Sequence, residues 1–203
     1  MRDILIPTTY LAPLSVFALM AQTKDTIYIE TQEHYVKQSF RNRCIIAGSN
    51  GPLSITVPIL KPQSPSVLIK DIRISNHGNW RHLHWNSLIS AYGMSPFFEY
   101  YEDDFAPFYE KKYEFLFDFN QALLQLVCDE IDFHPNLAYT ETYQAEVEND
   151  FRTLIHPRNK KDLPHFTPQP YYQVFSERHG FLPNLSIVDL LFNMGPESIL
   201  KLI

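Results

Sequence analysis

The sequence predicts an α/β protein in which a strand-rich N-terminal part, residues 1–78, forms a mixed sheet and a mainly helical part, residues 79–203, packs on it. Short β-branched runs separated by turn residues support the first part. Apolar residues at helical spacing from Asn79 onward support the second. A chain of 203 residues is long enough to bury a large core, so we expect one domain over residues 1–203.

The N-terminal part is expected to open with a strand–helix–strand unit. Asp3–Ile6 and Thr26–Glu30 are short apolar runs typical of buried strands. Leu14–Gln22 follows Pro13, a residue that is tolerated in the first turn of a helix. Two strands joined through a helix favour a parallel pair.

A hairpin is expected next, over Phe40–Leu60. Its turn is GSNGP at residues 48–52, where two glycines and an asparagine supply positive-φ positions. A further strand is expected at Val67–Ile74, after a proline-rich loop.

The second half is expected to hold four helices and one long loop. The helices are Trp80 to Gly93, Tyr109 to Ile131, Tyr143 to Leu154, and the segment between Ser186 and Gly195. Ser186 resembles an N-cap, and Asp189 three residues later makes a variant capping box. Residues 157–170 are polar and rich in proline, which indicates an ordered loop or a lid.

The segment TQEHYVKQSFRNR, Thr31–Arg43, is the strongest candidate for a working face. On a strand, alternation would place on one face Lys37, Ser39, Arg41 and Arg43. Three cations together require water, carboxylates or a bound anion, and guanidinium and ammonium groups are the usual ligands of phosphate and carboxylate. A solvated strand face is the alternative, and spacing alone favours it.

His84 and an acidic cluster are the candidates for proton chemistry. His84 falls on the apolar face of its helix beside Trp80 and Leu88. It is therefore either a core histidine bonded to a carbonyl or a general acid or base tuned by partial burial. The stretch FEYYEDDF at residues 98–105 sets four carboxylates among aromatic rings. They could raise one another's pKa, bind magnesium, or cap the next helix, and the cap is favoured.

Composition and motifs exclude several classes of protein. The net charge of −6 argues against a nucleic-acid partner. Cys44 and Cys128 lack disulfide or zinc spacing, and the sequence has no GxGxxG, GxxxxGK[ST], HExxH or GxSxG motif. Pro7 and Pro13 interrupt the apolar stretch at residues 4–21, so we expect no signal peptide, no membrane insertion and a cytoplasmic protein. No metal site is indicated and no cofactor can be named.

Four segments, in order, resemble the WbqC-like family of bacterial proteins. They are TTYLAPLSVFALM, IETQEHYVKQSFRNRCIIAGSNGPLSITVPI, WRHLHWNSLISAYGMSPFFEYYEDD and YYQVFSERHGFLPNLSIVDLLFNMGP. They span nearly the whole chain, and about residues 106 to 168 carry the least resemblance. Longer members of the family begin with a segment that resembles QPxxxPxxGYF. The corresponding segment here, IPTTYLAPLSVF, lacks the Gln and the Gly of that pattern.

The resemblance implies a protein linked to gene clusters for O-antigen or other surface polysaccharides. We therefore expect a transferase that acts on an activated sugar, acyl or aminoacyl donor, with a phosphorylated or carboxylated small molecule as substrate. The residues expected to hold the anion are Lys37, Arg41, Arg43 and Lys61, with Asn42 orienting a polar group. The rings expected to stack on a sugar or base are Tyr10, Trp85 and Tyr100.

In this hypothesis His84 is the catalytic acid or base, and Asp103 is its orienting partner or a metal ligand. A non-catalytic protein that binds an anionic glycan precursor or a partner enzyme is the alternative, because the same cations serve binding equally well. Convergence of His84 and Asp103 with the cationic segment in one pocket would favour the enzyme. A third, purely structural interpretation pairs Arg41 and Arg43 with Glu33, Asp71 or Asp103 and leaves no pocket. The oligomeric state is not indicated.

Overall fold

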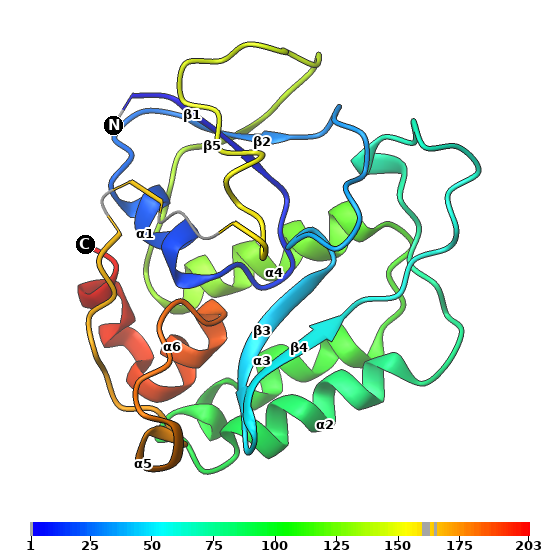
Figure 1. The fold of residues 1–203 in the computed structure, drawn as a ribbon. Helices are drawn as coiled ribbons and strands as arrows, with labels where there is room; N and C mark the ends of the chain where they lie inside the picture. Colours follow the sequence, from blue (N-terminus) through cyan, green and yellow to red (C-terminus); the bar gives the residue numbers. More distant parts are fainter. Residues whose placement is uncertain (1, 160–162, 165) are drawn as a thin grey trace.

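The computed structural model describes residues 2–159, 163–164 and 166–203, and it has the mixed α/β architecture that the sequence predicts. A parallel sheet lies at the top of Figure 1, above an antiparallel hairpin and most of the helices. In spatial order, the strands of the sheet are β1 (Ile4–Pro7), β2 (Ile27–Glu30) and β5 (Leu137–Tyr139).

The predicted strand–helix–strand unit at the N-terminus is confirmed. Helix α1 (Leu14–Ala21) joins β1 to β2, and its first seven residues are all buried. A buried helix start needs partners for its free N–H groups. The N–H of Leu14 donates to the carbonyl of Leu185, and the N–H of Ser15 donates to the side-chain oxygen of Asn184, both at 2.9 Å. A segment distant in sequence therefore caps α1.

The hairpin predicted over Phe40–Leu60 is also confirmed. Strands β3 (Arg43–Gly48) and β4 (Gly51–Thr56) pair in register from Arg43 opposite Thr56 to the glycine turn. The strand predicted at Val67–Ile74 is wrong, because a single 3-10 turn, η1 (Ile69–Asp71), takes its place. Ile69 and Ile72 are both buried, and their spacing of three suits a 3-10 turn rather than the period of two of a strand.

The cationic strand expected before the hairpin is wrong as well. Residues 37–42 turn, and β3 begins only at Arg43. Gln38 has a φ of 58, which breaks an extended path and ends the alternation of faces. As a result Lys37 is exposed, Arg41 is buried and Arg43 is half-buried.

Helices dominate the second half of the chain. Helices α2 (Trp80–Tyr92) and α6 (Ile187–Met194) lie where helices were predicted. The single helix predicted over Tyr109–Ile131 is instead two, α3 (Phe98–Glu110) and α4 (Leu116–Glu130). The chain is extended at the C-cap of α3, where ψ is 153, and this extension separates the two helices.

Two further predictions in this half are wrong. The segment 143–154 is not a helix, because the backbone of Leu5 bonds with Asn149 and Phe151 and holds this segment alongside β1. The hydroxyl of Ser186 donates to the carbonyl of Leu11 instead of capping α6. Within the predicted loop at 157–170, the described residues form neither helix nor strand, and residues 160–162 and 165 lie outside the described part.

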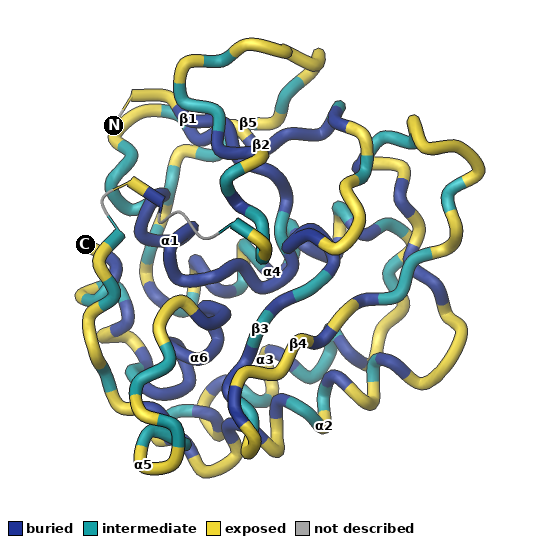
Figure 2. The backbone as a smooth tube through the Cα atoms, viewed as in Figure 1, coloured by how far each residue is buried: buried dark blue, intermediate teal, exposed yellow. Residues whose placement is uncertain are grey.

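Burial is continuous across the centre of the molecule. In Figure 2 the buried colour runs from β1 and β2 through α1 and part of β3 to α6, whereas most of β4 and the 141–146 loop are exposed. Two short elements complete the surface near the C-terminus, α5 (Ser176–His179) and η2 (Gly195–Lys201).

Gly195 offers a test of the packing between α6 and the start of α3. It has a φ of 58 and a ψ of −137, and a Cβ there would lie 2.5 Å from a ring carbon of Phe97. Gly180 has a similar backbone, with φ 70 and ψ −170, and nothing within 4 Å of such a Cβ. We expect Gly180→Ala to cost only backbone strain of about 1–3 kcal/mol, and Gly195→Ala to cost more. Urea denaturation measures both losses, and equal losses would contradict the contact with Phe97.

Candidate functional site

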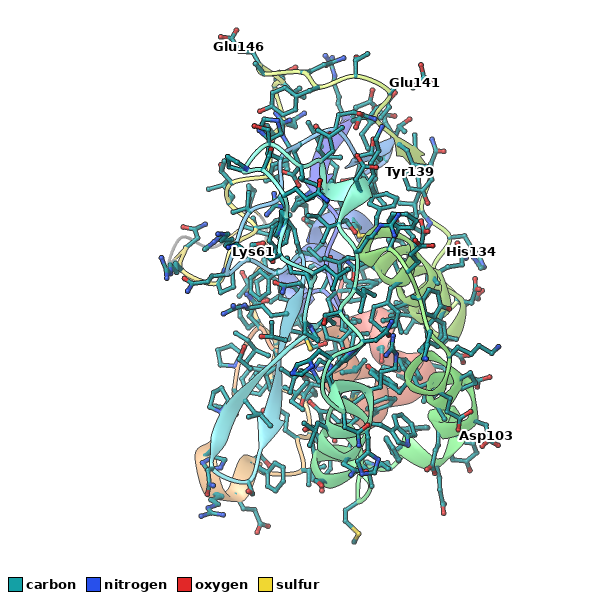
Figure 3. All side chains as sticks on the ribbon, turned by 90° about the vertical axis from the view of Figure 1, so that its right-hand side faces the viewer. Lys61, Asp103, His134, Tyr139, Glu141 and Glu146 are labelled. Atoms are coloured by element: carbon teal, nitrogen blue, oxygen red, sulfur yellow. The ribbon has the colours of Figure 1, made fainter. Side chains whose placement is uncertain are left out.

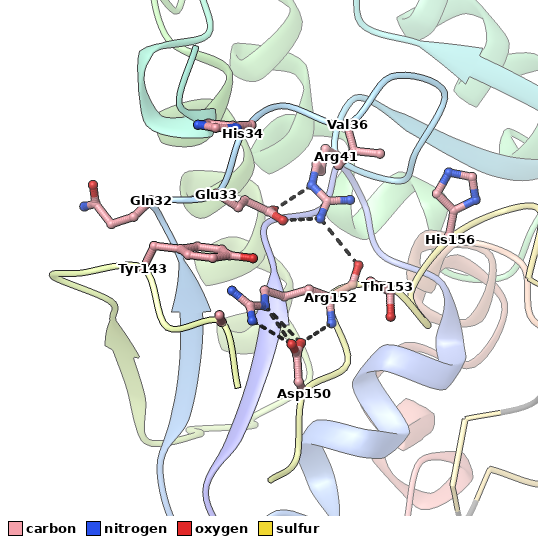
Figure 4. Close-up of a pocket in the computed structure, with 11 residues that line it drawn as sticks. Gln32, Glu33, His34, Val36, Arg41, Tyr143, Asp150, Arg152, Thr153 and His156 are labelled. Carbon is pink, nitrogen blue, oxygen red and sulfur yellow. Dashed lines mark hydrogen bonds and ion pairs between the residues drawn. The ribbon is translucent and has the colours of Figure 1, made fainter. Parts of the chain in front are cut away.

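A polar cavity of about 640 Å³ opens at the carboxyl end of β2 (Figure 4). Its lining comes from two segments, residues 32–41 after β2 and residues 143–156 after β5. The carboxyl ends of parallel strands are where open α/β sheets bind their ligands. The topology therefore places this cavity where a binding site is expected.

Arg41 forms one wall of the cavity and is held by a carboxylate. Its side chain is 2% exposed, and its Nε and Nη2 groups donate to the two carboxylate oxygens of Glu33 at 2.7 and 2.5 Å. Burial raises the pKa of Glu33, while the Arg41 guanidinium pulls that pKa down. Arg41 also reaches the carbonyl of Arg152 at 3.4 Å, so it connects the two lining segments.

Arg152 forms the opposite wall. Its Nε donates to both oxygens of Asp150 at 3.0 Å, and its Nη1 donates to Glu30 at 2.7 Å. The ring of Tyr143 lies 4.7 Å from the guanidinium carbon, a cation–π distance. Burial alone would raise the pKa of Asp150, but the hydrogen bonds from Arg152 hold that pKa below its ordinary value.

Glu30 is the last residue of β2 and is fully buried. Besides Arg152, it accepts from the backbone N–H of Gln32 at 2.7 Å and from the hydroxyl of Thr140 at 2.6 Å. A buried carboxylate is tolerated when it is paired and hydrogen-bonded in this way. The charges around the cavity are thus fixed in position by protein groups.

Of the predicted site residues, Arg41 lines this cavity. Its partner Glu33 is among the carboxylates expected by the structural interpretation, but a cavity is present beside the pair. Sequence reasoning missed Asp150 and Arg152, which lie where a helix was predicted. Asp150 and Arg152 are two residues apart, so their side chains lie on the same face of an extended segment. This spacing is the sequence signal that could have identified them.

Lys37 and Lys61 come together elsewhere, in a pocket of about 360 Å³. Tyr35 and Val67 also line it, and no carboxylate is among its described lining residues. Arg43 is half-buried, and its Nε is buried without a hydrogen-bond partner in the described chain. Lys37, Arg41 and Arg43 are therefore close in sequence but lie in different surroundings.

His84 lies in a buried aromatic cluster, away from both pockets. Its Nε2 lies 3.2 Å from the carbonyl of Thr56, which can only accept, so Nε2 carries the proton. Its Nδ1 then accepts from the hydroxyl of Tyr10 at 3.0 Å, and the Tyr10 oxygen accepts from Tyr109 at 2.9 Å. Burial lowers the pKa of His84 to about 4. Its surroundings match the core histidine bonded to a carbonyl.

The pairing of His84 with Asp103 is not formed, because Asp103 is exposed on α3 and both ring nitrogens of His84 have other partners. Figure 3 shows Asp103 and Lys61 well apart on the surface. Tyr100 is 76% exposed on α3, and half-buried Trp85 packs on Phe98 and Tyr109. Asn42 is buried, and its side-chain nitrogen donates to the carbonyl of Val57 at 2.9 Å.

No group of three or more His, Cys, Asp or Glu side chains among the described residues could hold a metal ion. Within the same residues, no helix is both long enough and apolar enough to cross a membrane.

Comparison with known proteins adds a family assignment. The model of the WbqC-like protein family matches residues 8–162, a range that includes both buried arginines of the cavity. The chain is also similar to an uncharacterized protein, Rv1507c, of Mycobacterium tuberculosis (strain ATCC 25618 / H37Rv). The two are 25% identical over 220 residues, which cover 96% of this chain and 94% of that protein. No solved structure matches the chain significantly.

Arg152→Met tests how strongly the buried pairs hold the structure. The variant leaves Glu30 buried without its cation, and we expect it to lower the free energy of unfolding by about 3–5 kcal/mol. Arg73→Met is the control, because the pair of Arg73 with Glu114 is exposed and should contribute little. Urea denaturation at neutral pH measures both. Similar losses in the two variants would show that the Arg152 pairs are not important for stability.

The pKa of His84 predicts a pH dependence of stability. The unfolded chain protonates this histidine below pH 6.5, whereas the folded chain keeps it neutral down to about pH 4. The unfolded state therefore binds more protons between these values, and stability falls as pH falls, by about 3 kcal/mol in total. His84→Gln should remove this part of the slope, while His82→Gln, on the exposed face of α2, should leave it. Identical slopes in the two variants would contradict the depressed pKa.

Proposed function

Because the chain belongs to the WbqC-like protein family, we propose that it is a cytoplasmic enzyme of bacterial surface-polysaccharide precursor biosynthesis, of the O-antigen type. It transfers a group on an activated sugar, or on an acyl or aminoacyl donor. The substrate occupies the 640 Å³ cavity at the end of β2.

The two buried arginines, Arg41 and Arg152, carry this proposal. Removing a charge from water costs several kcal/mol, and apolar side chains of similar volume often stabilise a fold equally well or better. Both arginines nevertheless line one cavity. This cavity lies at the carboxyl end of a parallel strand, the position at which open α/β sheets generally bind ligands. A polar cavity with prearranged charges suits a polar ligand, which supports a binding role for these residues.

The chemistry of the lining suits a hydroxyl-rich, anionic substrate. Within the described chain no group accepts from Nη1 of Arg41, so that group is available to a ligand oxygen. The carboxylates of Glu33 and Asp150 keep lone pairs for sugar hydroxyls, and Tyr143 offers a ring for stacking. His34 is exposed at the cavity and is the side chain that we assign to proton transfer.

Non-catalytic binding of an anionic glycan precursor is the second candidate. The separation of His84 and Asp103 from Arg41 favours it, because the expected acid–base pair does not converge on the cavity. The same cavity serves a binder and an enzyme, so turnover distinguishes the two.

The proposal is tested by a thermal-shift screen with UDP-glucose, dTDP-glucose, acetyl-CoA and aminoacyl adenylate analogues, each with and without magnesium. A ligand at a hundredfold excess over its Kd stabilises the folded state by about 2.7 kcal/mol. Ala145→Trp places an indole at the cavity and should abolish the shift, because Ala145 lines the cavity with only a methyl group.

Glu146→Trp is the matched control, since Glu146 is the next residue of the same loop and projects into solvent at the top of Figure 3. It should keep the shift. Mass spectrometry of the reaction mixture, with candidate acceptors added, then looks for a transferred group. A shift without turnover would favour the binder, and a shift that survives Ala145→Trp would move the ligand out of this cavity.

A further inference from the structure

The parallel sheet has a hollow on the face that is turned away from the core. Ile4, Ile27 and Ile29 are buried and form part of the core. Alternation along β1 and β2 puts Leu5 and Tyr28, which are register partners, on the opposite face. Parallel sheets are normally covered on both faces. Here the loop that follows β5 passes over this outer face (Figure 1) and leaves a hollow of about 530 Å³ between the loop and the strands.

The loop separates this hollow from the cavity that contains the buried arginines. Thr142 and Gln144 line the hollow, whereas Tyr143 and Ala145 line the cavity. This period of two is that of an extended chain, in which successive side chains point to opposite sides. The carbonyl of Gln144 accepts from Nη2 of Arg152 at 2.7 Å, which fixes the loop to the cavity. The two spaces are therefore distinct and share one wall.

The hollow and the cavity differ in charge. Arg41 and Arg152 line the cavity, whereas no lysine, arginine or histidine is among the described residues that line the hollow. The charged residues of the hollow are Asp3 and Glu141, and neither forms an ion pair within the described chain. These carboxylates would repel a phosphate or a carboxylate ligand. The hollow therefore suits a ligand without negative charge.

Hydrogen-bond donors and acceptors are both available in the lining. No described residue hydrogen-bonds to the side chains of Thr142, Gln144 or Tyr28. Hydroxyl and amide groups donate and accept, and the carboxylates of Asp3 and Glu141 add acceptors. A cation would use the acceptors alone and leave the amide N–H groups unused. Sugar hydroxyls donate and accept, so a neutral saccharide matches both kinds of group.

Tyr28 supplies a flat apolar surface beside these polar groups. It lies on the middle strand of the sheet and is 37% exposed, next to buried Leu5. Tyr139 also contributes to the lining, but its ring packs on Phe117 of α4, with the ring centroids 5.7 Å apart. The ring of Tyr28 is therefore the one that can stack on the C–H face of a sugar. Sites for small molecules generally have volumes of about 300–1,000 Å³, a range that includes this hollow.

We propose that the hollow between residues 140–147 and the outer face of the sheet is a second binding site, which takes a neutral saccharide. Tyr28 stacks on the sugar ring, and Thr142 and Gln144 bind its hydroxyls. The site is additional to the cavity assigned to the proposed substrate, and the argument for it does not depend on that substrate.

The site is tested by NMR titration of the isotope-labelled whole chain with glucose, galactose and N-acetylglucosamine. At least one of these sugars should bind saturably. Gln144→Trp places an indole at the hollow and should abolish this binding. Ala145→Trp is the matched control, because the next residue of the same loop lines the cavity instead. It should leave the affinity for the sugar unchanged.

Tyr28→Leu removes the flat ring and keeps an apolar side chain on the strand. It should weaken sugar binding about fivefold, because stacking on an aromatic ring contributes about 1 kcal/mol. Tyr28 is partly exposed, so the variant should fold normally even if Gln144→Trp does not. Unchanged affinity in Tyr28→Leu, loss of binding in Ala145→Trp, or no saturable binding of any of the three sugars to the wild type would overturn the site.

Two charged derivatives of glucose test the class of ligand. Glucose 1-phosphate carries a negative charge, and glucosamine carries a positive charge at slightly acid pH. At the site that Gln144→Trp blocks, both should bind more weakly than the best neutral sugar. Tighter binding of glucose 1-phosphate there would overturn the charge argument, and tighter binding of glucosamine would make the hollow a cation site.

Failure of this proposal is distinguishable from failure of the proposed function. Sugar binding that depends on Gln144, without a thermal shift from any activated donor, would keep this site and remove the proposed substrate. A donor-induced shift that is lost in Ala145→Trp, without binding of any neutral sugar, would do the reverse.

Discussion

The double pairing of Arg152 with Glu30 and Asp150 is the constraint on which the arrangement of the cavity depends. Glu30 ends β2, the central strand, and the Asp150 segment lies alongside the edge strand β1, so one guanidinium joins the middle of the sheet to the segment that flanks its edge. Removing these charges from water is costly unless each is hydrogen-bonded. Arg152 also donates to the carbonyl of Gln144, and Glu30 also accepts from Thr140 and Gln32. The backbone on both sides of the cavity is thereby fixed.

Arg41 extends this arrangement across the cavity, because it binds Glu33 on its own segment and the carbonyl of Arg152 on the other. The two walls are therefore connected by protein groups before a ligand is present. Such preorganisation lowers the free-energy cost of ordering a binding site.

The local elements were predictable where local pattern decides them. The apolar run of α1, the glycine turn at residues 48–51 and the helical spacing of α2 each gave the correct element. The prediction of a cationic strand was wrong because an alternating sequence pattern does not reveal the positive φ of Gln38. Of the cavity, Arg41 was found because it lies in a conspicuous charged segment. Arg152 was not found, because its partner Glu30 lies 122 residues away and only the fold brings them together.

The hydrogen bonds that join residues 184–187 to the N-terminal half have a consequence for biosynthesis. The segment caps α1 through Leu185, and the N–H groups of Ser186 and Ile187 bond the carbonyls of Ile45 and Ala12. None of these bonds can form until residues 184–187 have been synthesised and have left the ribosome. Until then, the first helix and the hairpin lack these hydrogen bonds. Contacts so distant in sequence slow folding and leave apolar surface open to association, so the nascent N-terminal half is the form most in need of a chaperone.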